Sequence, residues 1–470
     1  MNRASILACL GLQNGDRAGI AINQSFGILR KAVALVALIL PLGAYASSPT
    51  ETVLHTWVET TTNENGGSVA GMTIDSNGNV YGVTFGTGAC SVGCGSVFKL
   101  NKQANGGFVY QDLHNFLGGL RGDGANPYGA PILDGAGNIY GTTMAGGNGS
   151  GIIYKVSPLG NGKYQETVLH TFGAFGTNDG TQPFSTLAFD KAGNLYGTTN
   201  QGGGGANNTF CINGCGTVFK LSPNSDGTWT ESVIHSFPGT AGNLDGQNPH
   251  GGVVFDRAGN LWGTAQNGGN MEACLPFIDV TGCGVVFELT PQAGGEWTET
   301  TVFEFAGEST GFNPWDGLVM DRAGNLYGMV TNGGGGNGAV FKLTPQAGGG
   351  VAETIIHAFT PCGAVCTDGA NPENGITIDA KGNLYGTTDL GGHGGGSPTG
   401  HGVVFKLTPR PNGTWQETIL HQFTGGADGA FPLDDHVAVD PAGDVFGTTL
   451  NGGQPGICPS GCGVVFEIKP

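Results

Sequence analysis

The stretch "DKAGNLYGTT" (Asp190–Thr199) has six close copies in this chain of 470 residues. The copies begin at Asp75, Asp134, Asp256, Asp321, Asp379 and Asp440. With Asp190 included, successive leading aspartates are 59, 56, 66, 65, 58 and 61 residues apart. A repeat with a period of this size is typical of propellers and solenoids.

Each period contains four short runs with strand character. Examples are "STLAFD", "NLYGTT", "GTVFKL" and "ETVLHTF", which we name strands A, B, C and D in chain order. β-branched and aromatic residues dominate these runs, and Gly, Asn, Asp and Pro separate them. Four strands per unit define a propeller blade. The sequence therefore predicts an all-β, seven-bladed propeller with four-stranded antiparallel blades.

The repeated aspartate opens the turn between strands A and B. In "DKAGN", the Gly stands where a tight hairpin needs a positive φ, and the Asp can accept hydrogen bonds from the amides that follow it. We therefore interpret the seven aspartates as turn formers. A joint calcium-binding or catalytic role is the alternative.

The number of strands predicts how the ring closes. The first D-like run, "ETVLHTW" (Glu51–Trp57), precedes the first A strand, whereas the last repeat ends at "GVVFEIKP" without a D strand. We predict that Glu51–Trp57 supplies the outer strand of the last blade and pairs antiparallel with Val464–Ile468. This N-terminal strand would remove an open sheet edge.

Residues 1–46 do not follow the repeat. Arg30 and Lys31 precede the apolar run "AVALVALILPLG", and small residues follow at Ala44–Ala46. This pattern predicts a signal peptide with a long n-region, followed by a single propeller domain at 47–470. We expect export to the extracellular space, the cell surface or the periplasm, with no membrane span after cleavage. Retention of the leader as an anchor is the alternative.

The charge of the chain restricts its partners. The formal net charge is −18, and it becomes −21 without residues 1–46, which carry four basic residues and one acidic residue. Such a surface repels nucleic acid and anionic lipid. We therefore expect no nucleic-acid partner, and we expect cations or neutral partners such as glycans.

The cysteines fit an oxidising compartment. Ten of the eleven lie in the repeat region and form local pairs. The pairs are Cys90 with Cys94, Cys211 with Cys215, Cys274 with Cys283, Cys362 with Cys366, and Cys458 with Cys462. Zinc would need two pairs side by side, and no pair has a histidine at ligand spacing. We therefore predict five disulfides and no metal site.

The motifs "DAKGNLYGTT", "GVVFKLTP" and "ETILHQF" closely resemble the GloVer repeat, named for Gloeobacter and Verrucomicrobia. The resemblance covers nearly all of Glu51–Pro470. It implies an exported bacterial repeat protein. It implies no established activity, so no functional residues carry over from the family.

Strand order also predicts a functional face. The A–B and C–D turns lie on one face of the ring, and the irregular B–C and D–A loops lie on the other. Because binding residues often lie on variable loops of a rigid scaffold, we expect the functional site on this loop face. The residues that open strand A should surround the central channel on this loop face. Their seven positions hold Val69, Tyr128, Phe184, His250, Trp315, Glu373 and Leu433.

From this rim and the positions that follow it, we select nine candidate binding residues. They are Tyr128, His250, Trp315, Asp316, Glu373, Asn374, Asp434, Asp435 and His436. Aromatic rings next to carboxylates suit a sugar ring or a cation. The alternative is that these mixed side chains simply plug the channel.

Histidines recur at one place in strand D. They are His55, His114, His170, His235, His357 and His421, with Phe303 in the seventh copy. This regularity indicates packing between blades. We find no Ser-His-Asp order and assign no catalytic residue.

Three functional hypotheses follow. The one we favour is an exported, non-enzymatic binding scaffold that uses the loop face and channel mouth to bind a glycan or an envelope protein. A carbohydrate-active lyase or hydrolase at the channel mouth, with a carboxylate pair and His250 or His436, is the second. A purely structural envelope protein is the third. We expect no cofactor, with calcium as the alternative.

Overall fold

The computed structural model describes most of the repeat region. The described ranges are 48–57, 69–86, 94–119, 122–173, 178–204, 211, 213–239, 245–274, 282–360, 366–392, 400–432, 436–453 and 461–470. They belong to one compact unit, Ser47–Pro470. The predicted leader at 1–46 lies outside the described residues and stays a prediction.

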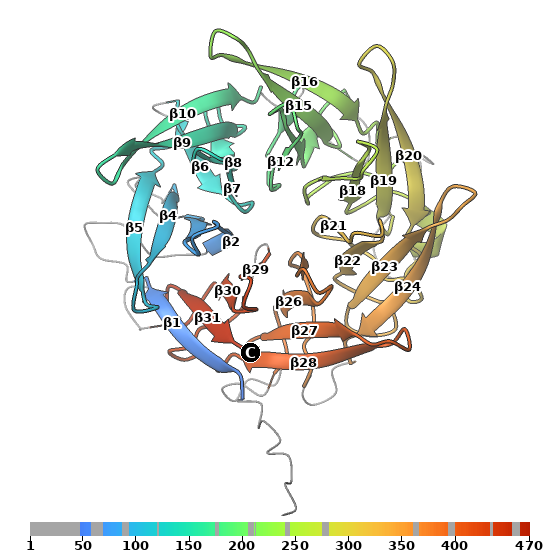
Figure 1. Cartoon of the computed structure of the whole chain (residues 1–470). Helices are drawn as coiled ribbons and strands as arrows, with labels where there is room; N and C mark the ends of the chain where they lie inside the picture. Colours follow the sequence, from blue (N-terminus) through green and yellow to red (C-terminus); the bar gives the residue numbers. More distant parts are fainter. Residues whose placement is uncertain are drawn as a thin grey trace, which may run out of the picture. The chain divides into compact units, whose positions relative to one another are not determined.

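The repeats fold into seven antiparallel sheets that follow one another around a ring in chain order, with strand D outermost (Figure 1). The first blade consists of β2 (Val69–Ile74), β3 (Val80–Thr84), β4 (Ser96–Lys102) and β5 (Phe108–Asn115). In the second blade, β6 (Gly124–Pro127) and β7 (Ile132–Leu133) both pair with β8 (Ile139–Gly146), and β9 (Ile152–Gly160) and β10 (Lys163–Thr171) follow.

The next four blades have the same order. The third contains β12 (Ala188–Phe189), β13 (Leu195–Thr199), β15 (Thr217–Pro223) and β16 (Trp229–Ser236), and β11 (Gly180–Thr181) pairs with β14 (Gln201–Gly202). The fourth contains β17 (Val254–Phe255), β18 (Leu261–Ala265), β19 (Val285–Pro291) and β20 (Trp297–Glu304). The fifth contains β21 (Val319–Met320), β22 (Leu326–Val330), β23 (Ala339–Pro345) and β24 (Val351–Ala358). The sixth contains β25 (Thr377–Ile378), β26 (Leu384–Thr388), β27 (Val403–Pro409) and β28 (Trp415–Gln422).

The seventh blade joins the two ends of the repeat region. It contains β29 (Ala438–Val439), β30 (Val445–Thr448), β31 (Val464–Lys469) and β1 (Thr50–Thr56). Strand β1 pairs antiparallel with β31, from Thr50 opposite Lys469 to Thr56 opposite Val464, as the blue and red strands in Figure 1 show. The predicted seven-bladed fold and its closure are therefore confirmed.

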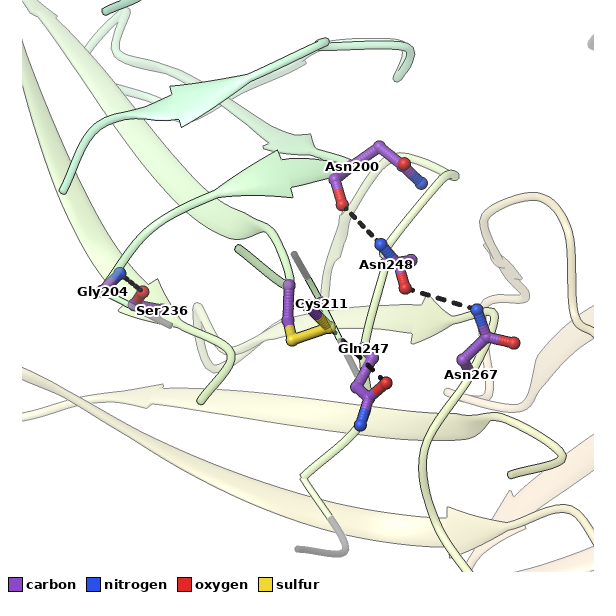
Figure 2. The surroundings of a disulfide bond; sticks show 8 residues. Asn200, Gly204, Cys211, Ser236, Gln247, Asn248 and Asn267 are labelled. Atoms are coloured by element: carbon purple, nitrogen blue, oxygen red, sulfur yellow. Dashed lines mark hydrogen bonds between the residues drawn. A yellow bond between two sulfur atoms is a disulfide. The ribbon is translucent and has the colours of Figure 1, made fainter. Parts of the chain in front are cut away.

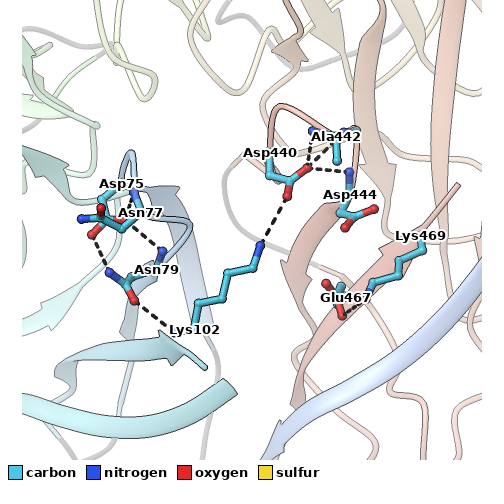
Figure 3. A network of polar contacts seen from close by, with 10 residues as sticks. Asp75, Asn77, Asn79, Lys102, Asp440, Ala442, Asp444, Glu467 and Lys469 are labelled. Carbon is cyan, nitrogen blue, oxygen red and sulfur yellow. Dashed lines mark hydrogen bonds and ion pairs between the residues drawn. The ribbon is translucent and has the colours of Figure 1, made fainter. Parts of the chain in front are cut away.

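A second contact crosses the same junction. Lys102, at the end of β4 in the first blade, forms an ion pair of 3.8 Å with Asp440 in the A–B turn of the last blade (Figure 3). The Asp440 carboxylate also accepts hydrogen bonds from the amides of Ala442, Gly443 and Asp444 in its own turn. Side-chain contacts thus support the strand pairing that closes the ring.

Helical structure is minimal. The described residues contain one helix, α1 (Met271–Cys274). No helix in these ranges is long and apolar enough to cross a membrane.

The core lies between neighbouring blades. One buried cluster joins Tyr140 and Ile153 of the second blade to Leu187 and Phe219 of the third. Within each blade, the Gly that follows the aromatic residue of strand B allows a strand C aromatic ring to lie against strand B. A Cβ at Gly263 would stand 2.5 Å from the Phe287 ring, and that distance explains why the Gly recurs.

Every outer strand pair contains a bulge near the position of the recurring histidine, which is Phe303 in the fourth blade. In β10, for example, the pairing register shifts between Val168 and His170. The same shift occurs in the other six blades. Because side chains alternate between the two faces of a strand, one extra residue places Glu166 and His170 on opposite faces, although they are four residues apart.

The turn aspartates act as the sequence predicts. Asp379 Oδ1 accepts hydrogen bonds from the amides of Lys381 (2.8 Å) and Asn383 (2.9 Å), and Oδ2 accepts from Asn383 Nδ2 (2.6 Å) and the Tyr385 hydroxyl (3.1 Å). Burial alone would raise the pKa of this carboxyl, but these hydrogen bonds outweigh burial and lower it below its ordinary value of 3.8. Asp75, Asp134, Asp190 and Asp321 show the same pattern.

Removal of the closing strand should destabilise the whole ring. We expect a protein that begins at residue 58 to melt at a clearly lower temperature than one that begins at residue 47, because β31 then becomes an open edge. Thermal melts followed by circular dichroism compare the two. Equal melting temperatures would contradict a structural role for the β1–β31 pairing.

The turn aspartates should also make stability depend on pH. A carboxyl whose folded pKa is depressed stabilises the fold above its ordinary pKa, and the contribution is lost as pH falls through the folded value. We expect Asp379→Asn to lower the melting temperature at pH 7, with the difference from the wild type shrinking below about pH 4. Glu296→Gln, at an exposed carboxylate, is the control. A difference that is constant with pH would refute this origin.

Candidate functional site

The predicted rim residues lie together at the start of the innermost strands. Tyr128 and Phe184 meet edge to face, with ring centroids 5.2 Å apart, and Phe184 stacks on His250 at 4.3 Å. His250 in turn lies 4.7 Å from Trp315. Side chains from four successive blades thus form one continuous aromatic cluster.

Two acidic residues stand beside this aromatic cluster. The Asp316 carboxylate lies 3.8 Å from His436 Nδ1 and accepts a hydrogen bond from the Gly317 amide. Glu373 lines the same small space, and burial raises the pKa of its carboxyl. The structure therefore brings together six of the nine candidate residues: Tyr128, His250, Trp315, Asp316, Glu373 and His436.

The cluster leaves little room. The space among these side chains is about 10 Å³, close to the volume needed for one water molecule. A sugar could enter only if the aromatic rings moved apart. Ligand binding and hydrolysis at the channel mouth therefore stay hypotheses, and Asp434 and Asp435, on which both also depend, lie outside the described residues.

Asn374 lies in the wall of the channel. Only 2% of its surface is exposed, and its Nδ2 donates hydrogen bonds to Thr387 Oγ1 in the same blade and to the Pro432 carbonyl of the next. These contacts connect the sixth and seventh blades.

Replacement of Asn374 by Ala tests this connecting role. The change removes two buried hydrogen bonds, although the Pro432 carbonyl still accepts one from Thr387 Oγ1 (3.3 Å). We therefore expect a loss of about 1–3 kcal/mol in the free energy of unfolding. Denaturant titration measures the loss. An unchanged stability would instead favour the predicted role of Asn374 in ligand contact.

Near the A–B turns, the central channel is wider than it is among the aromatic rim residues. A mostly apolar cavity of about 400 Å³ is lined there by residues that immediately precede the turn aspartates, including Ile74, Ile378 and Val439. Its polar lining includes Thr73, Thr377 and His436.

The loop face is held by disulfides and asparagine contacts. Cys211 pairs with Cys215 and Cys274 with Cys283, as predicted. Near the first of these, Asn248 Nδ2 donates to the Asn200 carbonyl (3.0 Å), and Asn248 Oδ1 accepts from Asn267 Nδ2 (3.3 Å) (Figure 2). Cys94, Cys366 and Cys462 are also disulfide-bonded, while their predicted partners Cys90, Cys362 and Cys458 lie outside the described residues.

A larger groove lies on the turn face, between the third and fourth blades. Its volume is about 510 Å³. Phe255 and Trp297 form its partly exposed apolar wall, and the buried Tyr196 ring packs against both, at 5.1 and 6.1 Å. We did not predict this groove from the sequence, because its walls come from two different repeats.

Two cations flank the groove. Lys191 and Arg257 occupy the same turn position in successive repeats, and both are exposed. The adjacent Asp190 and Asp256 carboxylates accept hydrogen bonds within their own turns. Neither Lys191 nor Arg257 forms an ion pair with any residue in the described ranges. The recurrence of Lys or Arg in "DKAGN" and "DRAGN" was the available sequence signal.

These features define the class: a disulfide-bonded, seven-bladed propeller whose first strand completes its last blade. The chain belongs to the Gloeobacter/Verrucomicrobia repeat family, whose model matches residues 44–211 and 205–466. The resemblance seen in the sequence is thereby confirmed.

Known structures are similar only at the level of the fold. An ancestral GH74 enzyme is 12% identical, with 89% of this chain and 51% of that chain covered and a TM-score of 0.49. The calcium structure of a carbohydrate-active enzyme of family AA12 from Trichoderma reesei is 12% identical, with 90% and 96% covered and a TM-score of 0.38. No curated protein is significantly similar to the chain.

Proposed function

We propose that this chain is an exported binding propeller whose ligand is a glycan held in the groove between the third and fourth blades. The groove is the observation that carries the proposal. Its volume of about 510 Å³ falls within the range typical of small-molecule sites. Its wall combines aromatic rings with polar groups, the combination that such sites use for affinity and orientation.

The aromatic wall suits the apolar face of a sugar ring. Trp297 is half-buried at the start of β20, and its packing against Tyr196 fixes its orientation. Tyr196 is itself fixed, because its hydroxyl donates to Asp190 Oδ2 at 3.2 Å. A rigid aromatic side chain contributes contact area with little loss of conformational entropy on binding.

The flanking cations favour sugars that carry a carboxylate. Lys191 and Arg257 can donate charge-assisted hydrogen bonds, which are about twice as strong as neutral ones. Without the predicted leader, the net charge of −21 opposes a polyanion at long range. Salt screens that repulsion beyond about 8 Å. The Asp190 and Asp256 carboxylates also line the groove, but they accept hydrogen bonds within their own turns, whereas Lys191 and Arg257 are exposed and form no ion pair among the described residues.

Export is supported by the disulfides. Such bonds persist in oxidising compartments and are rare in the cytosol. Together with the predicted leader, they support a ligand outside the cell or in the periplasm.

Binding to defined polysaccharides tests the function. We expect the protein to bind a polyuronate such as alginate more tightly than neutral dextran, with an affinity that falls as salt is added. Trp297→Ala and Arg257→Glu should each weaken binding by roughly tenfold, or about 1.4 kcal/mol. Isothermal titration calorimetry measures the affinities.

The chain offers matched controls for both changes. Trp415 occupies the same place in the sixth blade and packs against Tyr327 at 5.8 Å, so Trp415→Ala should leave binding unchanged. Arg322→Glu tests a turn cation outside the groove lining. Equal losses in the groove variants and the controls, or no binding to either polymer, would contradict the proposal.

A further inference from the structure

Histidine and carboxylate groups converge at three of the junctions between blades. Each group combines a strand D histidine, an aspartate from the D–A loop that follows it, and a glutamate from strand D of the next blade. The ligand atoms within each group all lie within 4.8 Å of one another. The groups are His114, Asp123 and Glu166; His170, Asp179 and Glu231; and His357, Asp368 and Glu417.

The strand D bulge creates this arrangement. Because it places Glu166 and His170 on opposite faces of β10, one strand contributes to two junctions. Glu166 faces the group of His114, and His170 faces the group of Glu231. The convergence is therefore a property of the repeat and not of one loop.

Several buried atoms in these groups lack the hydrogen bonds expected of them. His170 Nε2 lies 3.4 Å from Asp179 Oδ2, yet within the described part of the chain neither His170 Nε2 nor Glu231 Oε1 has a hydrogen-bond partner. The equivalent atoms of His114 and Glu166 also lack hydrogen-bond partners. In the third group, His357 Nε2 and Glu417 Oε1 form no well-directed hydrogen bond but lie 3.2 Å apart as an ion pair. A buried polar atom without a hydrogen-bond partner costs about 1–3 kcal/mol. Such atoms also occur at other junctions, as His235 Nε2 and Glu353 Oε1 show, but among the described residues a histidine, an aspartate and a glutamate converge only at these three.

Backbone amides hold the aspartate carboxylates of these groups in fixed orientations. Asp179 accepts hydrogen bonds from the amides of Gly173 (2.7 Å) and Gly180 (2.8 Å). Asp123 accepts from those of Leu117 (2.7 Å) and Gly124 (2.6 Å). Hydrogen bonds of this kind orient the carboxylates that bind metals in proteins.

We propose that each of the three groups binds a divalent transition-metal ion, and that Zn²⁺ fits best. Zn²⁺ binds both imidazole nitrogens and carboxylate oxygens, so one histidine and two carboxylates can supply three of its four ligands, and the two carboxylates neutralise the charge of the ion. Ligands about 2.1 Å from a tetrahedral zinc ion are about 3.4 Å apart. That spacing matches the His–Asp distances of 3.4 Å in two of the groups, although His235 and Asp245 are equally far apart at a junction without this three-ligand group. Calcium, which prefers six to eight oxygens, fits less well.

Other junctions use different contacts between the same positions. At the junction of His235, the carboxyl of Glu299 lies beside that of Asp245, and burial with this neighbour raises the pKa of Glu299. His421 Nε2 and Asp428 Oδ2 are hydrogen-bonded at 3.2 Å. His55 stacks on Tyr110 at 3.9 Å, and Phe303 replaces the histidine opposite Glu353. Zinc binding is therefore expected at three junctions only.

Metal analysis of the whole protein tests the proposal. The protein, produced without a polyhistidine tag and freed of metal with EDTA, is titrated with Zn²⁺ and passed over a desalting column. Inductively coupled plasma mass spectrometry then measures the bound zinc. We expect about three ions per chain, one for each group, and a higher melting temperature with zinc. Ca²⁺ at the same concentration should bind at none of these groups.

Variants assign the ions to the groups. His170→Ala and the isosteric Glu231→Gln should each leave about two ions. The triple variant Glu166→Gln, Glu231→Gln and Glu417→Gln should leave none, while circular dichroism confirms that it is folded. Glu353→Gln, at the junction without a histidine, should keep all three. No zinc on the folded wild type, or the same amount on the triple variant, would overturn the proposal, as would equal binding of Ca²⁺.

Discussion

Each blade of this ring has two apolar faces, and only its neighbours can cover them. The buried cluster that joins Tyr140 of the second blade to Phe219 of the third shows this dependence directly. A row of such blades stays incomplete until its last member meets its first. The antiparallel pairing of β1 with β31 satisfies that requirement, and the Lys102–Asp440 ion pair spans the same junction. Every candidate site described above depends on this closure, because each is built from more than one blade.

The polar groups of the repeat have two different tasks. The turn aspartates act within a single blade, where Asp379 accepts hydrogen bonds from the turn that it opens. The strand D glutamates and histidines act between blades, because the bulge directs them to opposite sides. Local chemistry therefore shapes the blade, while the convergence of side chains from neighbouring blades produces the sites that could hold a ligand.

This division explains what the sequence could predict. The closure follows from the number of strands, and the role of Asp190 follows from the turn chemistry of "DKAGN". The rim position of Trp315 also follows from its place in the repeat, but its packing against His250 does not, since that contact joins two blades. The groove formed by Phe255 and Trp297 escaped prediction for the same reason. The convergence of His170, Asp179 and Glu231 was still harder to predict from the sequence. A bulge changes which face of the strand a side chain lies on, and no particular residue type marks its position.

The bulge has one more consequence, which concerns the symmetry of the ring. Five of the seven blades present a strand D glutamate on one side and a strand D histidine on the other, so neighbouring blades meet head to tail. In oligomers, head-to-tail interfaces close into rings when the rotation between subunits divides the circle evenly. The protein is thus comparable to a cyclic heptamer whose subunits are covalently joined. Its individual junctions can diverge in chemistry, as the Tyr110 and Phe303 junctions have, while the shared geometry of the other junctions keeps the ring closed.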